Sequence, residues 1–142
     1  MMRGGVTAMN VDSAPGEHPA DGLARKFQRE LSAGLTSLVL LALLADTDRD
    51  MYGYEIAKQL GSDENTAMPF KQGALYPVLR NLSAMGLLSS RVVPSYSGPP
   101  RRYYRITALG RETLERWQQS WLDTRAFVDS IVAPQTRHEA TP

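Results

Sequence analysis

The sequence predicts a mainly α-helical fold with one small β-hairpin. Apolar residues recur at helical spacing through most of residues 22–132. The exception is a pair of β-prone runs, Leu87–Val93 and Arg101–Thr107, separated by the turn-forming segment Pro94–Pro100. The chain has 142 residues, 42% of them hydrophobic, which suits one domain with one core.

The two ends of the chain lack this periodicity. Residues 1–21 are rich in Gly, Pro, Ala and small polar residues, so we expect a disordered N-terminal tail, and residues 133–142 read the same way. Between the tails we expect a DNA-binding domain over residues 22–107 and a C-terminal dimerisation helix over residues 108–132.

Two separate helices are predicted at the start of the domain. The first, Leu23–Ser32, is amphipathic and is expected to end near Gly34. Its apolar stripe has four-residue spacing and consists of Leu23, Phe27 and Leu31. The second, Ser37–Ala45, is almost entirely apolar, with Thr36 as a plausible N-cap, so we expect it to be buried in the core.

Three more helices complete the prediction. Tyr52–Leu60 carries a short apolar stripe. Lys71–Met85 is amphipathic and is followed by Gly86, a typical C-terminal cap. The last helix runs from an N-cap at Thr107 to about Val132.

Apolar residues of the last helix have coiled-coil-like spacings of 3, 4, 7 and 4, which favours a dimer interface. These residues are Leu114, Trp117, Trp121, Val128 and Val132. We expect the apolar stripe of the first helix to contribute to the same interface. Trp117 and Trp121 lie four residues apart, so their indoles lie one above the other on one helical face. As an alternative to a purely structural interface, paired indoles from two subunits could bind a flat aromatic effector.

Charge is distributed unevenly, although the net charge is only +1. The stretch from Thr66 to Arg111 contains no Asp or Glu. Its seven basic residues are Lys71, Arg80, Arg91, Arg101, Arg102, Arg105 and Arg111. Seven cations without neutralising neighbours favour a surface that binds phosphate, while a solvated basic face with no partner is the alternative.

Several other classes of protein are disfavoured. The chain has no Cys, and its two histidines, His18 and His138, fall in the expected tails, so we expect no metal site, no cofactor and no catalytic site. The longest apolar run, Leu38–Ala45, is far shorter than the roughly 20 residues of a membrane helix. We therefore expect a cytoplasmic protein without enzymatic activity.

Three helices followed by a hairpin with a basic second strand is the order of a winged helix-turn-helix domain. In such a domain one helix enters the major groove of double-stranded DNA, and its N-terminal side chains reach the base edges. Gln72 is the expected base reader, because its amide can pair with a base edge. The candidate DNA-binding residues are Lys71, Gln72, Gly73, Ala74, Tyr76, Arg80, Arg101, Arg102 and Tyr103.

Some of these residues have a second interpretation. Tyr76 either binds a phosphate or packs beneath the recognition helix. Tyr103 and Tyr104 must point to opposite faces of their strand, so one should be buried and one exposed. Arg105 lies nearer the domain body and is either structural or a DNA contact. Tyr52 and Tyr54, which flank Gly53, are assigned to packing or to a helix start and not to the site.

Four motifs in order resemble the PadR family of transcriptional regulators. They are Tyr52-Gly-Tyr-Glu-Ile56, Gln72-Gly-Ala-Leu-Tyr-Pro-Val-Leu79, Leu82-Ser-Ala-Met-Gly-Leu-Leu88, and Arg101-Arg-Tyr-Tyr-Arg-Ile-Thr107 followed by Gly110. The resemblance spans about residues 35–113 and implies a homodimeric repressor that recognises a near-palindromic operator. Many relatives have Thr where Ala74 stands, and the wing tip here is neutral.

The resemblance also implies a recognition helix over residues 72–80, a wing over residues 94–100, and dimerisation through a single C-terminal helix, as in the shorter subgroup of the family. Some members are said to hold aromatic drugs between paired indoles. A winged-helix module that binds a protein partner, without specific DNA binding, is the alternative function.

Overall fold

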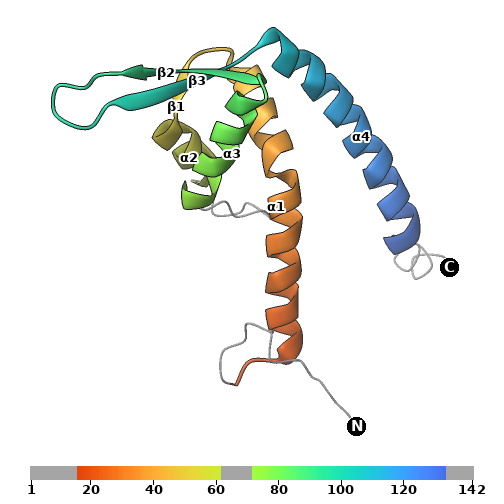
Figure 1. Ribbon diagram of the computed structural model, residues 1–142. Coiled ribbons are helices and arrows are strands. Elements are labelled where there is room, and N and C mark those ends of the chain that lie inside the picture. Colours follow the sequence, from red (N-terminus) through yellow and green to blue (C-terminus); the bar gives the residue numbers. More distant parts are fainter. Residues whose placement is uncertain (1–15, 62–71, 134–142) are drawn as a thin grey trace.

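The computed structural model describes residues 16–61 and 72–133. A small body contains α2 (Gly53–Gly61), α3 (Gln72–Ala84) and a three-stranded antiparallel sheet. The two long helices, α1 (Pro19–Thr47) and α4 (Ala108–Val132), extend from this body (Figure 1). The N-terminal part of α1 and the C-terminal part of α4 project beyond it. This arrangement confirms the mainly helical winged-helix prediction.

The first two predicted helices are one continuous helix, α1. Gly34 and Thr36 lie inside it, and Thr36 caps nothing: its buried hydroxyl donates a 2.6 Å hydrogen bond to the carbonyl of Ser32. The predicted break was wrong because one glycine costs a helix only about 1 kcal/mol and a threonine hydroxyl can bond to the preceding turn. The helix also begins within the range assigned to the tail, where Nδ1 of His18 accepts the backbone N–H of Ala20.

The continuous helix α1 is much longer than the apolar run Leu38–Ala45. By length and composition alone, α1 is sufficient to cross a membrane, so the short run Leu38–Ala45 was the wrong measure. However, Leu40, Leu41 and Leu44 of this run are fully buried inside the protein. These three leucines belong to the core of the folded domain, whereas only 28% of the most apolar 18-residue window of α1 is buried inside the protein.

The core lies where α1, α2, α3 and the sheet meet. Its fully buried residues are Leu40, Leu41, Leu44, Met51, Ile56, Leu75, Leu79 and Leu82. Leu114 at the start of α4 joins the same cluster. One face of α3 is thereby fixed against the body, which leaves its opposite face available.

The sheet has one strand more than predicted. The expected hairpin is present as β2 (Leu88–Val93) and β3 (Arg101–Ile106). A third strand, β1 (Met51–Tyr52), pairs with the other edge of β3, so α2 begins at Gly53 rather than Tyr52. Two residues are too few to show the alternation by which a strand is recognised.

Thr107 joins the turn after α3 to the start of α4. As predicted, it is the N-cap of α4: its hydroxyl accepts the N–H of Gly110 at 2.9 Å and donates to the carbonyl of Gly86 at 2.7 Å. Gly86 has φ of +82°, the left-handed conformation expected of the glycine that ends α3. A Cβ at Gly110 would lie 2.2 Å from the carbonyl oxygen of Leu87, so only glycine fits there.

Candidate nucleic-acid interface

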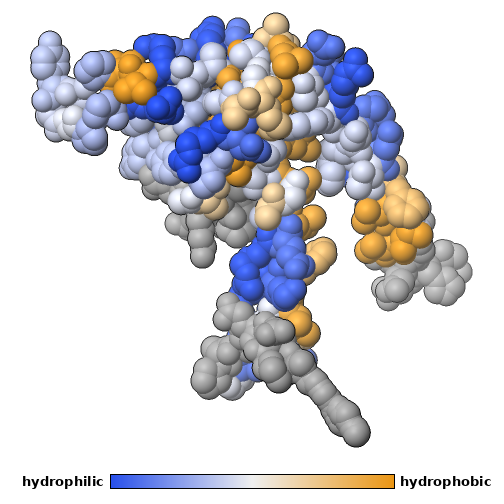
Figure 2. Space-filling model, viewed as in Figure 1, coloured by the Kyte–Doolittle hydropathy of each residue, from blue (hydrophilic) through white to orange (hydrophobic). Residues whose placement is uncertain are grey.

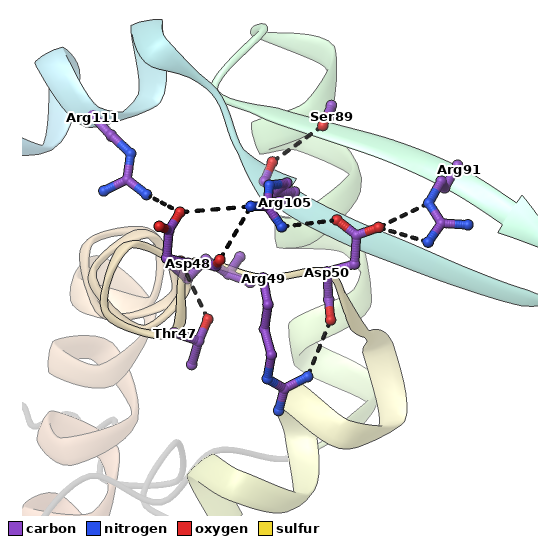
Figure 3. A network of polar contacts seen from close by, with 9 residues as sticks. Thr47, Asp48, Arg49, Asp50, Ser89, Arg91, Arg105 and Arg111 are labelled. Carbon is purple, nitrogen blue, oxygen red and sulfur yellow. Dashed lines mark hydrogen bonds and ion pairs between the residues drawn. The ribbon is translucent and has the colours of Figure 1, made fainter.

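Three arginines of the basic segment are neutralised by two aspartates that precede β1 (Figure 3). The carboxylate of Asp48 forms an ion pair with the guanidinium of Arg111 at 2.5 Å, and the backbone carbonyl of Asp48 accepts a hydrogen bond from Arg105 at 3.1 Å. Asp50 binds Arg91 at 2.7 Å through one carboxylate oxygen and Arg105 at 3.4 Å through the other. The expectation that these cations have no neutralising neighbours was therefore wrong for three of the seven.

These ion pairs also affect ionisation. The hydrogen bond from Arg91 holds the pKa of Asp50 below its ordinary value, and Arg105 adds to the effect. Of the two roles considered for Arg105, the structure shows the structural one, because its guanidinium bridges Asp48 and Asp50.

The arginines outside this network are Arg80, Arg101 and Arg102, whereas Lys71 lies outside the described residues. Within residues 16–61 and 72–133, no ion pair joins these three to a carboxylate. Arg102 donates to the hydroxyl of Ser90 at 3.1 Å, and the Arg101 guanidinium lies over the ring of Tyr52, 4.7 Å from its centroid. Neither contact cancels the positive charge.

The same three arginines line a groove of about 480 Å³, here called the wing groove. Its walls are the start of α2, the exposed side of α3 and the base and tip of the hairpin. The residues lining it are Tyr52, Gly53, Tyr54, Tyr76, Arg80, Ser95, Ser97, Gly98, Pro99, Pro100, Arg101, Arg102 and Tyr104. On the β1 side of β3, the pairing covers residues 103 and 104, and Arg101 and Arg102 lie just beyond it.

The exposed side of α3 forms one wall of this groove. Gly73, Ala74 and Arg80 are exposed, while Leu75 and Leu79 are buried. Gln72 begins the helix. Short side chains at Gly73 and Ala74 leave the first turn of the helix open to a close approach by a ligand.

Tyr76 both packs against the body of the domain and lines the wing groove. Its half-buried ring packs against α2, where a Cβ at Gly53 would lie only 2.4 Å from Tyr76 Cε1. The same side chain lines the wing groove. The packing interpretation is therefore shown, and phosphate binding stays a prediction.

Aromatic residues beneath the wing include two that sequence reasoning set aside. The prediction that one of the two tyrosines of β3 is buried is confirmed: it is Tyr104, whereas Tyr103 is partly exposed on the opposite face. The ring of Tyr52 neighbours those of Tyr103 and Tyr54, with centroid separations of 5.6 and 6.1 Å. The Tyr-Gly-Tyr pattern was visible in the sequence, but its place in the groove depends on β1, which was not.

No group of three or more His, Asp or Glu side chains in the described parts of the chain is placed to hold a metal ion. The chemistry of the wing groove is instead that of guanidinium and phenol groups. Such groups bind phosphate oxygens by charge-assisted hydrogen bonds.

A second groove, of about 600 Å³ and here called the helix groove, separates α1 from α4. Trp117 and Trp121 line it from α4, and Leu31, Leu35 and Leu38 line it from α1. Figure 2 shows apolar side chains along the edge of α1 that faces α4 and near the end of α4. The helix groove thus brings together residues predicted for an interface and for an effector.

Most residues predicted for the dimer interface are exposed in the single chain. They are Leu23, Phe27, Leu31, Trp121, Val128 and Val132. Trp117 is partly buried against the core. Leu114 is 6% exposed and packs within its own chain, so its assignment to the interface is corrected: it lies close to the body, where the first turns of α4 are still covered.

Comparisons with known proteins agree with this geometry. Residues 40–116 match the model of the Transcriptional regulator PadR-like family. The chain is 30% identical over 95 residues to Uncharacterized protein X of Lysinibacillus sphaericus, which covers 67% of this chain and 84% of that protein.

Solved structures give the same result. A PadR family transcriptional regulator from Eggerthella lenta has a TM-score of 0.67 and 27% identity, covering 81% of this chain and 96% of that one. A PadR-like transcriptional regulator from Bacillus cereus has a TM-score of 0.58 and 27% identity, covering 72% and 96%.

Proposed function

The chain belongs to the PadR-like family of transcriptional regulators, and from this premise we propose that it is a cytoplasmic homodimeric repressor that binds a near-palindromic operator. Membership of a family of transcriptional regulators implies that the chain binds DNA. In this chain, α3 enters the major groove and the wing base contacts the neighbouring backbone.

One observation carries the proposal: the arginines of the basic segment that no carboxylate of the described residues neutralises converge on the wing groove. Arg80 comes from α3, whereas Arg101 and Arg102 come from β3. Self-repulsion between like charges on one surface is offset when phosphates bind there. In this proposal the arginines provide affinity and Gln72, at the start of α3, provides base selection.

The exposed apolar residues of α1 and α4 support dimerisation. Phe27 on α1 and Val128 and Val132 on α4 are each at least 45% exposed, which is unfavourable unless a second copy covers them. To occupy successive major grooves on one side of the duplex, a two-fold dimer must hold its two α3 helices about 34–36 Å apart. Repression follows when this complex occludes a promoter.

The helix groove supports a regulatory role for a flat aromatic effector. Trp117 and Trp121 offer indole faces within a mostly apolar cavity, which suits such a ligand. An effector releases the operator only if it binds the DNA-free geometry more tightly than the DNA-bound one.

The test is binding of the purified protein to a labelled duplex from just upstream of its own gene, at two salt concentrations and against random DNA. We expect competitor-resistant binding by two protomers that weakens steeply with salt. Arg101→Ala should weaken binding to every sequence and reduce the salt slope by about one, whereas Gln72→Ala should mainly relax base preference.

Arg116→Ala is the matched control, because Arg116 is exposed on α4, pairs with Glu112 and does not line the wing groove. Equal losses on operator and random DNA for Gln72→Ala would refute its role in base reading. A wild-type protein with no salt-dependent affinity for duplex DNA would favour the alternative, a protein-interaction module.

A further inference from the structure

We propose that Tyr52 is a positioning residue for DNA binding: its ring holds the guanidinium of Arg101 at the rim of the wing groove. The inference rests on the proposed function, in which Arg101 contacts a DNA phosphate. Tyr52 itself needs no contact with DNA for this role.

The ring of Tyr52 is fixed from several sides. Tyr52 lies in β1 directly opposite Tyr103 in β3, and the two rings are tilted at 53° with centroids 5.6 Å apart. Tyr54 also stacks with the ring of Tyr52, at an interplanar angle of 27° and a centroid separation of 6.1 Å. Because neighbours hold it in place, Tyr52 presents a defined surface to Arg101, whose Cζ lies 4.7 Å from the ring centroid.

Arg101 and Arg102 project to opposite faces of β3, so a contact that holds one of them cannot hold the other. Arg102 is anchored by the hydroxyl of Ser90. Arg101 lies on the face that also carries Arg91, Arg105 and Asp50, and both carboxylate oxygens of Asp50 are occupied by those two arginines. Among the described residues, the ring of Tyr52 is thus the contact by which the structure holds the Arg101 guanidinium.

An aromatic ring and a carboxylate can both hold Arg101 in place, but they differ in their effect on its charge and its hydrogen-bond donors. A carboxylate would cancel its charge and compete with phosphate for its N–H groups. A ring attracts the cation through its quadrupole, so the net charge and the hydrogen-bond donors stay available. Fixing the side chain before binding also reduces the entropy lost when a phosphate docks.

The experiment is a double-mutant cycle, read by fluorescence anisotropy on a labelled random-sequence duplex at low salt. Phosphate contacts do not depend on sequence, so no operator is needed. We expect Tyr52→Leu to weaken binding about two- to five-fold, the range for an exposed cation–π contact, and Tyr52→Phe to retain wild-type affinity. In an Arg101→Ala background, Tyr52→Leu should have no further effect.

Tyr52→Val is the second variant, because a β-branched residue suits a strand and removes the ring if the leucine variant folds poorly. Thermal melts of every variant check the fold. An equal loss from Tyr52→Leu with and without Arg101, or a loss in Tyr52→Phe as large as in Tyr52→Leu, would overturn the inference and leave the proposed function intact. A wild-type protein that fails to bind duplex DNA would overturn both.

Discussion

Replacing Gly110 with alanine tests the packing at the start of α4. The new Cβ would lie 2.2 Å from the carbonyl oxygen of Leu87 and 2.7 Å from Cγ1 of Ile106. Ordinary contact needs about 3.5 Å, so the backbone must move by about 1 Å. The Leu87 carbonyl is held in place because it accepts the backbone N–H of Thr107 at 3.1 Å and is also within 3.1 Å of the Thr107 hydroxyl.

Forcing a methyl group into a packed site typically costs about 1–3 kcal/mol, and the cost here lies at the upper end because the obstacle is backbone rather than a movable side chain. The greater helix propensity of alanine recovers about 1 kcal/mol. We therefore expect Gly110→Ala to lower the free energy of unfolding by about 2 kcal/mol, or the thermal midpoint by roughly 5–10 °C.

The assay is urea unfolding followed by circular dichroism at fixed protein concentration. Gly34→Ala is the matched control: it is the same chemical change within α1, where a Cβ would meet nothing within 4 Å. We expect it to stabilise the protein by about 0.5–1 kcal/mol. If Gly110→Ala proved as stable as wild type, the close approach of α4 to Leu87 would be refuted.

Three further predictions concern charge, assembly and ligand binding. Arg91 lowers the pKa of Asp50, so this carboxylate stabilises the fold above its ordinary pKa and the contribution disappears as pH falls through the lowered value. Asp50→Asn should thus cost up to about 1 kcal/mol at pH 7 and flatten the loss of stability below about pH 4; an unchanged acid limb would contradict this. Val128→Asp should shift the protein to monomer in sedimentation while Gln118→Asp does not, and two dimeric variants would disprove the interface. Trp121→Ala should weaken binding of a flat aromatic dye at least ten-fold by fluorescence titration, and undiminished binding would place the dye elsewhere.

The elements that could be predicted from the sequence are those whose ends are marked by a characteristic capping residue. Gly86 and Thr107 mark the end of α3 and the start of α4, and each has the expected cap geometry. The two hairpin strands were visible from their β-prone residues and the turn between them. In contrast, the predicted break at Gly34 failed, because local propensity is a weak signal when packing favours a continuous helix.

The candidate site was predicted in outline, but its electrostatics were not. Arg91 and Arg105 lie 41 and 55 residues from Asp50 in sequence, so charge counted along the chain could not reveal their pairing. The contact between Tyr52 and Arg101 also depends on a strand pairing between distant segments. Long-range pairings of this kind arise from tertiary structure and leave no local pattern.

The half of α4 that leaves the body acts as a lever arm. Residues 118–132 are exposed all round, and Asp48 ties the start of the helix to the end of α1 through Arg111 and to β3 through Arg105. Leu114 and Trp117 hold the first turns against the core, so the free arm over residues 118–132 is about 22 Å long, and a rotation of about 5° where it leaves the body displaces its far end by about 2 Å. Small changes in the angle at which α4 leaves the body are thereby amplified at its tip into displacements of about half the distance between neighbouring atoms of a packed interface.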